Sequence, residues 1–176
     1  MFNLEKQDLK NKKVIIRVDL NVPLDDNFNV TDTTRIEACK ETIDLILDKG
    51  GICILISHFG RPKEREDKFS LKHIVETVSD VLDHPVFFHN DCIGDKVQEV
   101  ISNLNPGDII LLENLRFYKE ETLGDILFAE ELSKLEYKPN FLIRGLLVDR
   151  ERGNVLKVDT HKYVKVAYHG FSKLSK

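Results

Sequence analysis

The sequence of 176 residues predicts an α/β protein, in which a parallel, doubly wound sheet is followed by an antiparallel C-terminal appendage. Three observations predict this fold. Short β-branched runs alternate with longer segments whose apolar residues recur every three or four positions. One run, residues 52–56 (ICILI), is apolar throughout, as is typical of a strand covered on both faces. After about residue 135 the helical pattern stops and alternating runs follow one another around a turn.

The alternation begins with a strand and a long helix. Residues 14–18 (VIIRV) predict the strand, and residues 34–48 predict the helix. Thr34 and Glu37 form a capping-box pattern, which places the start of this helix, and Gly50-Gly51 marks its end. The apolar residues of its predicted buried face are Ile36, Cys39, Ile43, Ile46 and Leu47.

Further strands and helices follow the strand at 52–56. Ser70 is expected to cap a helix that runs to about residue 82. The remaining predicted elements are a strand at 86–88, a helix at about 94–104, a strand at 109–112 and a helix at 125–135. This rhythm is that of a Rossmann-like parallel sheet with helices on both faces.

The last part of the chain has a different pattern. Residues 146–149 and 155–159 alternate and are joined by a turn that contains Gly153-Asn154, which predicts a β-hairpin. A third strand-like run covers residues 163–167. We therefore expect a boundary near residues 135–140, with an α/β domain over residues 1–135 and a β-rich tail over residues 136–176.

Composition narrows the classes of function. The net charge of −4 argues against a nucleic-acid partner, because proteins that bind the phosphate backbone usually carry a basic excess. No apolar run approaches the roughly 18 residues that span a bilayer. The N-terminus lacks the apolar core of a secretory signal, so we expect a cytoplasmic protein without a membrane partner. Cys39, Cys53 and Cys92 have no CxxC spacing, and the first two are expected to be small buried hydrophobes, without a metal or disulfide role.

Polar and cationic residues gather where the predicted strands end. In an open parallel sheet, ligands bind in the crevice beyond the carboxyl ends of the strands. The residues in this position, together with one arginine at the start of the first helix, are Asp19, Asn21, Arg35, His58, Arg61 and Arg116. The three arginines and the histidine among them, at 35, 61, 116 and 58, predict an anion site on one rim of the sheet.

Each residue type suits a phosphorylated acid. Asn21 can donate to and accept from a hydroxyl group, whereas an ionised Asp19 only accepts. Arg61 can hold a phosphate with two parallel hydrogen bonds, and His58 can donate to a phosphate oxygen. The alternatives are a turn cluster for 19–23 and a solvated surface loop for 57–62.

The two other arginines depend more on their surroundings. The charge of Arg35 opposes the macrodipole at the first turn of its helix, so we expect a ligand or an acid partner, with Glu37 or Asp32 as candidates. Taken alone, Arg116 would be interpreted as a surface salt-bridge partner. Its assignment to the anion site depends on the other cationic residues predicted at the same edge. Neither GxxxxGK[ST] nor GxGxxG occurs, so no loop for nucleotide phosphates is recognised.

Four stretches resemble the N-terminal-domain motifs of the phosphoglycerate kinase family, in order and spacing. They are RVDLNVP at 17–23, TRI at 34–36, SHFGRP at 57–62 and LLENLRFYKEE at 111–121. The likeness extends through FAEELSKL at 128–135, which makes it about three-quarters of the chain. It implies binding of 3-phosphoglycerate by this domain, and Mg-ATP or Mg-ADP on a second domain of the complete enzyme.

The resemblance also implies roles for the site residues. Asp19 and Asn21 would hold the hydroxyl and carboxylate end of the substrate, and the phosphate would lie against His58, Arg61 and Arg116. Arg35 would be the catalytic arginine that stabilises charge on the transferred phosphoryl group.

The sequence departs from the family after residue 135. EYKPNFLIRGLLVD stands where the family continues into a strand ending in an Asn-Asp-Ala-Phe type motif. The glycine-rich phosphate loops of the nucleotide-binding domain are absent from this sequence, so we expect no cofactor on this chain and little activity from it alone. Residues 141–170 resemble a segment of cytosolic purine 5′-nucleotidases of the haloacid-dehalogenase-like superfamily, without the DxDxT nucleophile motif.

These likenesses leave three hypotheses for function. The first is the substrate-binding half of a phosphoglycerate kinase, which transfers a phosphoryl group between 1,3-bisphosphoglycerate and ADP in glycolysis. The second is a non-catalytic fusion or assembly module, whose partner would be a separate nucleotide-binding half. The third is a remnant of a 5′-nucleotidase-type phosphatase.

Overall fold

The protein folds around a five-stranded parallel sheet. The computed structural model describes residues 7–135 and 166–168. The strands are β1 (Lys13–Arg17), β2 (Ile52–Ile56), β3 (Val86–His89), β4 (Ile109–Leu112) and β5 (Val166–Tyr168). Their order across the sheet is β3-β4-β2-β1-β5, and every pair of neighbours is parallel. The predicted parallel sheet is confirmed, with strand bounds that agree to within one residue for the four strands of residues 1–135.

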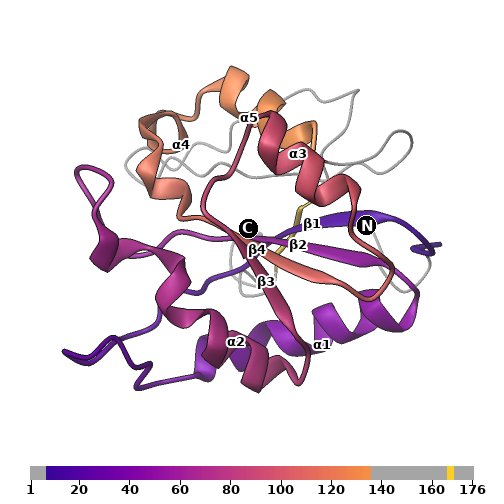
Figure 1. The fold of residues 1–176 in the computed structure, drawn as a ribbon, viewed down its shortest axis with the longest axis horizontal. Coiled ribbons are helices and arrows are strands. Elements are labelled where there is room, and N and C mark those ends of the chain that lie inside the picture. Colours follow the sequence, from indigo (N-terminus) through magenta and orange to yellow (C-terminus); the bar gives the residue numbers. More distant parts are fainter. Residues whose placement is uncertain (1–6, 136–165, 169–176) are drawn as a thin grey trace, which may run out of the picture.

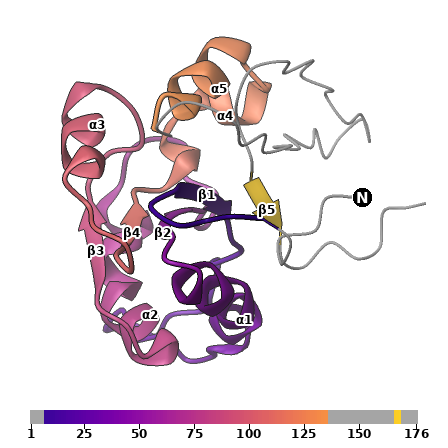
Figure 2. The same cartoon turned by 90° about the vertical axis from the view of Figure 1, so that its right-hand side faces the viewer.

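Helices cover both faces of this sheet. The α-helices are α1 (Thr34–Asp48), α2 (Val75–Leu82), α3 (Asp95–Ser102), α4 (Lys119–Leu123) and α5 (Ile126–Ser133). Helices α1 and α2 lie on one face, whereas α3, α4 and α5 lie on the other (Figures 1 and 2). The predicted doubly wound architecture is therefore present.

Alternate strand residues supply two separate cores. Ile16 and Leu55 pack with residues of α1 and α2, whereas Ile15 and Ile54 pack with residues of α3 and α5. Successive side chains of a strand point to opposite faces. Because both faces are covered, the interior strands are apolar at nearly every position, as the run at 52–56 predicted.

The first turn of α1 differs from the predicted capping box. The residue before the helix is Thr33, and its hydroxyl donates to Glu37 Oε1 at 2.6 Å. The backbone N–H of Thr34 donates instead to Asp32 Oδ1 at 2.8 Å. The prediction that Thr34 is the cap residue is wrong, because Asp32 and Thr33 supply the polar side chains one position earlier.

The segment predicted as one helix over residues 70–82 has two parts. It begins as a 3-10 helix, η3 (Leu71–Ile74), and continues as α2. Ser70 caps it as expected, since its hydroxyl oxygen accepts from the backbone N–H of Lys72 at 3.2 Å.

Strand β5 corrects one part of the predicted tail. The run at 163–167 was expected in an antiparallel meander, but β5 pairs with β1 in parallel, with Ile15 opposite Val166 and Arg17 opposite Tyr168. A parallel strand satisfies the backbone groups of β1 on the side away from β2. The predicted hairpin at 146–149 and 155–159 lies outside the described residues.

The three cysteines are free and buried, which confirms the packing role predicted for Cys39 and Cys53. Burial raises the pKa of Cys39 to about 11, and it also raises the pKa of Cys53 and of Cys92. Within residues 7–135 and 166–168, no helix is long and apolar enough to cross a membrane.

The two cores predict the effect of truncating a central side chain. Ile54 is fully buried in β2, so Ile54→Ala should lower the free energy of unfolding by about 2–5 kcal/mol through lost burial and a cavity. Ile126, which is 58% exposed, provides the matched control, and Ile126→Ala should change stability by less than about 0.5 kcal/mol. Urea unfolding of both variants measures the difference, and equal effects would contradict this assignment of the core.

Candidate functional site

The candidate site lies at the carboxyl edge of β2 and β4. These strands are neighbours, but the chain leaves β2 toward α2 on one face and leaves β4 toward α4 on the other. Such a reversal opens a crevice at the strand ends, where open α/β sheets bind ligands. The segments that follow β1, β2 and β4 gather on this side, at the left of Figure 1.

Asn114 holds the segments after β2 and β4 together. Its side chain is fully buried and forms four hydrogen bonds. Oδ1 accepts from the backbone N–H of Phe59 at 2.9 Å and of Arg116 at 3.0 Å. Nδ2 donates to the carbonyls of Phe59 at 2.7 Å and Phe69 at 2.9 Å. The backbone next to His58 and that of Arg116 are therefore fixed by one carboxamide.

The side chain of Glu113 also holds the segment that follows β4. Its carboxylate is buried and accepts from Ser70 Oγ at 2.8 Å and from the backbone N–H of Leu71 at 2.9 Å. It also accepts from the N–H of Asn114 at 2.8 Å. A buried carboxylate with three hydrogen bonds is well compensated, so this end of β4 is rigid.

The segment after β1 is tied to the segment after β2. The N–H of Leu20 donates to Ser57 Oγ at 3.0 Å, and the N–H of Gly60 donates to Asn21 Oδ1 at 2.8 Å. Gly60 has a φ of +59°, and a Cβ there would lie 2.5 Å from a ring carbon of Phe69. Glycine is therefore needed at this position. Since Gly60 occupies Asn21 Oδ1, the amide NH₂ is the group that Asn21 can offer to a ligand.

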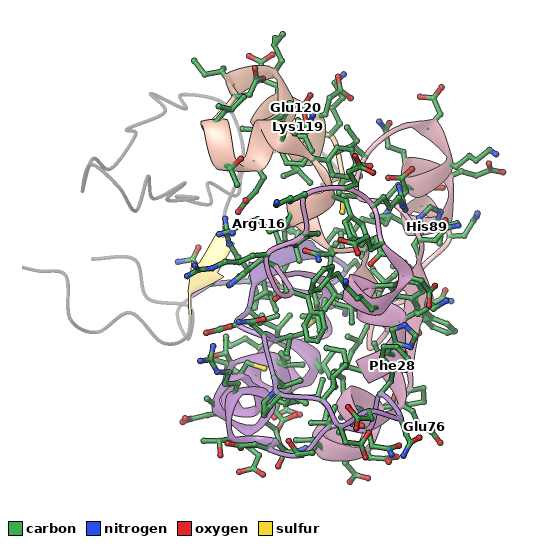
Figure 3. All side chains as sticks on the ribbon, turned by 90° about the vertical axis from the view of Figure 1, so that its left-hand side faces the viewer. Phe28, Glu76, His89, Arg116, Lys119 and Glu120 are labelled. Atoms are coloured by element: carbon green, nitrogen blue, oxygen red, sulfur yellow. The ribbon has the colours of Figure 1, made fainter. Side chains whose placement is uncertain are left out.

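A buried carboxylate lies between two arginines at this edge. Glu121 of α4 accepts from Arg17 Nη2 at 2.6 Å, and its second oxygen lies 2.8 Å from Arg116 Nε. The Glu121 side chain is 4% exposed, against 18% for Arg17 and 23% for Arg116. Arg116 lies between the sheet and α4, which carries Lys119 and Glu120 (Figure 3). The predicted site residue Arg116 is thus part of an arginine pair.

His58 lies in the field of the same arginines. Its pKa is lowered from 6.5, first because burial disfavours the imidazolium, and then because of the nearby charges of Arg116 and Arg17. Asp19 and Glu121 oppose this shift in part. The ring therefore favours the neutral form until an anion enters, whereas the sequence-based argument considered only the effect of the anion.

Arg35 has an acid partner, but a different one from the candidates proposed from the sequence. Arg35 Nη1 donates to Asp19 Oδ2, with the two side chains 50% and 44% exposed. The expected candidates were Glu37 and Asp32. Hydrogen bonds with Thr34 lower the pKa of Asp32, and the charge of Arg35 adds a smaller effect in the same direction. An ion pair this exposed contributes about 0–1 kcal/mol, so a ligand can displace it at low cost.

The six predicted residues differ in how closely the structure joins them. His58 and Arg116 share one electrostatic environment with Asp19, and Asp19 in turn contacts Arg35. Asn21 contacts the loop after β2. Arg61 follows that loop with an exposed side chain, which makes no hydrogen bond or ion pair within the described part of the chain.

Arg17 and Glu121 were not predicted as site residues. Arg17 stands two positions before Asp19, and the alternation of the strand places both on one side. That spacing was a usable signal for Arg17. Nothing local marks Glu121, which is one of several acidic residues in a charged segment.

The structure is thus a doubly wound α/β domain with a cluster of cationic side chains at the carboxyl edge of its sheet. The family model described as phosphoglycerate kinase matches residues 4–137. The chain therefore belongs to the phosphoglycerate kinase family, as the four motifs predicted.

Individual relatives agree with this membership. The chain is 51% identical to a phosphoglycerate kinase of Bradyrhizobium diazoefficiens over 132 residues, which are 75% of this chain and 33% of the relative. It is 41% identical over 169 residues to a cytosolic phosphoglycerate kinase of Nicotiana tabacum, covering 96% of this chain and 41% of the relative. The chain thus spans between a third and about two-fifths of the length of these relatives.

Solved structures show the same fold. The crystal structure of phosphoglycerate kinase from Pyrococcus horikoshii OT3 superposes with a TM-score of 0.69 at 32% identity, over 77% of this chain and 35% of that chain. Phosphoglycerate kinase from Coxiella burnetii gives a TM-score of 0.64 at 32% identity, over 74% of this chain and 32% of that chain.

A second family model also matches the chain. The 5′ nucleotidase family model covers residues 113–176, so it overlaps the first model over residues 113–137. This confirms the predicted likeness of the tail to 5′-nucleotidases. The wider assignment to the haloacid-dehalogenase-like superfamily stays a prediction.

Asn114 gives a direct test of how the site is held. Asn114→Ala removes four hydrogen bonds and leaves buried backbone groups unpaired, so we expect a loss of about 2–4 kcal/mol in the free energy of unfolding. Asn103→Ala, which removes one exposed side-chain bond to Glu99, should cost less than about 0.5 kcal/mol. Thermal and urea unfolding compare the two. Similar small losses in both variants would show that Asn114 does not hold the loops.

The environment of His58 predicts a pH dependence. Its folded pKa lies below the value of about 6.5 expected for the unfolded chain, so the unfolded state binds the proton more readily. The contribution of His58 to stability should therefore be lost as pH falls from about 6.5 through the folded pKa. A titration followed by NMR, with His58→Gln to assign the signal, measures this pKa. A midpoint at or above 6.5 would contradict the geometry.

Proposed function

We propose that this domain binds 3-phosphoglycerate and acts as the acid-substrate half of a phosphoglycerate kinase, in glycolytic phosphoryl transfer between 1,3-bisphosphoglycerate and ADP. The observation that carries the proposal is the pairing of Arg17 and Arg116 beside His58 at the carboxyl edge of β2 and β4. Family membership over residues 4–137 supports it. A cytoplasmic location is proposed with it, in keeping with the cytosolic tobacco relative.

The phosphate of the ligand would bind to the cations of this edge. Guanidinium groups can hold phosphate through two parallel hydrogen bonds, and Arg61 has an exposed side chain for this role. His58 would take up a proton as the dianion approaches, because a nearby negative charge favours imidazolium. Arg17 and Arg116, which are paired with Glu121, and the exposed Arg61 would thus surround the anion.

The other end of the ligand would meet the β1 loop. Asp19 can accept from a hydroxyl group, and the free NH₂ of Asn21 can donate to a carboxylate. When the ligand takes Asp19, the exposed pair with Arg35 opens. Arg35 is then free to stabilise charge on the transferred phosphoryl group, the step in which an arginine is most effective.

The nucleotide is proposed to bind elsewhere. Among the residues described, no group of three or more His, Cys, Asp or Glu could hold a metal ion. We assign these residues no step through Mg-ATP or Mg-ADP. A separate nucleotide-binding half is the proposed partner.

The match of residues 113–176 to 5′-nucleotidases favours a second candidate, a fusion module whose tail derives from that family. Phosphate release from inosine monophosphate by the purified chain would support a nucleotidase activity. We expect none, because the DxDxT nucleophile motif is not in the sequence.

Calorimetric titration with 3-phosphoglycerate at low salt tests the proposed function. We expect binding that Arg61→Ala weakens by about tenfold or more, since a charge-assisted hydrogen bond contributes about 1.5–3 kcal/mol. Lys96→Ala is the matched control, because it removes one exposed positive charge from α3 and should bind normally. ATP should give no heat. Equal affinity of Arg61→Ala and the unchanged protein would overturn the assignment.

A further inference from the structure

Glu121 is a buried carboxylate that contacts both fixed arginines of the site. One oxygen, Oε1, accepts from Arg17 Nη2 at 2.6 Å, and the other, Oε2, lies 2.8 Å from Arg116 Nε. Arg17 comes from the end of β1, Arg116 from the segment after β4, and Glu121 from α4. The carboxylate thus joins the end of β1 to the segment that follows β4, which is about a hundred residues further along the chain.

The charges explain why a carboxylate is needed there. Two guanidinium groups that share one partner lie close together, and like charges repel strongly where water is scarce. Glu121 neutralises one of the two positive charges, so Arg17 and Arg116 can stay in place before a ligand arrives. A net positive charge remains for the ligand.

The contacts also decide which N–H groups face a ligand. Glu121 occupies the Nε side of Arg116, and within the described residues the two Nη atoms of Arg116 make no hydrogen bond or ion pair. The Nε–H bond is not aligned with Glu121 Oε2, and both atoms lack a hydrogen bond there. Within the described residues, no hydrogen bond therefore occupies the end of the guanidinium that can bind phosphate with two parallel bonds.

We propose that Glu121 is a positioning residue for the phosphate-binding arginines. Its two oxygens set the separation of Arg17 and Arg116 and leave their outer N–H groups for the anion. This inference rests on the proposed function, because the anion is the phosphate of 3-phosphoglycerate.

A positioning role for Glu121 and a purely electrostatic effect of its charge predict opposite changes in anion affinity for Glu121→Gln. Charge alone predicts tighter anion binding, because the substitution removes a negative charge from the site. Positioning predicts weaker binding, because a carboxamide has one acceptor oxygen and one NH₂ donor. The NH₂ group would face an N–H group, so only one of the two arginines can keep its partner.

The experiment compares two neighbouring glutamates by calorimetric titration with 3-phosphoglycerate at low salt. Glu121→Gln should bind about 10-fold to 100-fold more weakly, the loss seen when a residue that orients a metal ligand is removed. Glu120→Gln makes the same charge change one residue away on an exposed side chain and should bind as tightly as the unchanged protein or slightly tighter. Equal or tighter binding by Glu121→Gln would overturn the proposal.

Two further variants separate the effect of the arginine positions on binding from the effect of a less stable protein. Ile54→Ala weakens the core without touching the arginines and should bind normally. Glu121→Asp keeps the charge but draws the carboxylate back by one methylene, so it should fold and bind at least about fivefold more weakly. If Glu121→Gln does not fold, Glu121→Asp decides the question, and normal binding by it would overturn the proposal.

A measurement without ligand distinguishes this inference from the proposed function. The Nε–H signals of Arg17 and Arg116 in ¹⁵N NMR report on their surroundings in the free protein. The chemical shifts of these signals should change in Glu121→Gln and should be unchanged in Glu120→Gln. Failure of the unchanged protein to bind 3-phosphoglycerate would refute the proposed function, whereas unshifted arginine signals would refute the role of Glu121.

Discussion

The site depends on one buried carboxamide that holds together two segments leaving the sheet in opposite directions. Strands β2 and β4 are neighbours, and the chain turns toward α2 after one and toward α4 after the other. Such a divergence opens a crevice but also leaves backbone groups without partners. The four hydrogen bonds of Asn114 supply those partners. The same bonds fix the backbone next to His58 and the backbone of Arg116. Binding geometry and local stability thus rest on the same contacts.

The two acid–arginine contacts of the site differ in a way that fits two roles. Glu121 is buried with Arg17 and Arg116, and breaking a buried pair is costly because a charge is left without a partner. Asp19 and Arg35 are about half exposed, so water replaces either partner at little cost. The first contact suits arginines that must keep their place before the ligand arrives. The second suits the role proposed for Arg35, in which the arginine leaves its acid partner when the ligand binds.

The sequence was sufficient for features that depend on local pattern. Continuous apolar runs located β2 and β4, and helical periodicity located α1, each with its bounds. The rule that parallel strands end at one edge placed Arg116 beside His58. Features that depend on distant contacts were not readable. The partner of Arg35 comes from the β1 loop rather than from its own helix, and the buried Glu121 is paired with Arg17 at the end of β1. Alternation along 163–167 likewise contained nothing about the direction of pairing, which proved parallel.

The overlap of the two family matches bears on how the tail relates to the site. Every predicted site residue, together with Arg17 and Glu121, precedes residue 122, and the phosphoglycerate kinase match continues to residue 137. All of these residues therefore lie within the part of the chain that the phosphoglycerate kinase model matches. The tail still acts on the site through β5, since Tyr168 pairs with Arg17 across the sheet and Arg17 is the last residue of β1. The pairing of β5 thus holds the strand end from which Arg17 reaches Glu121.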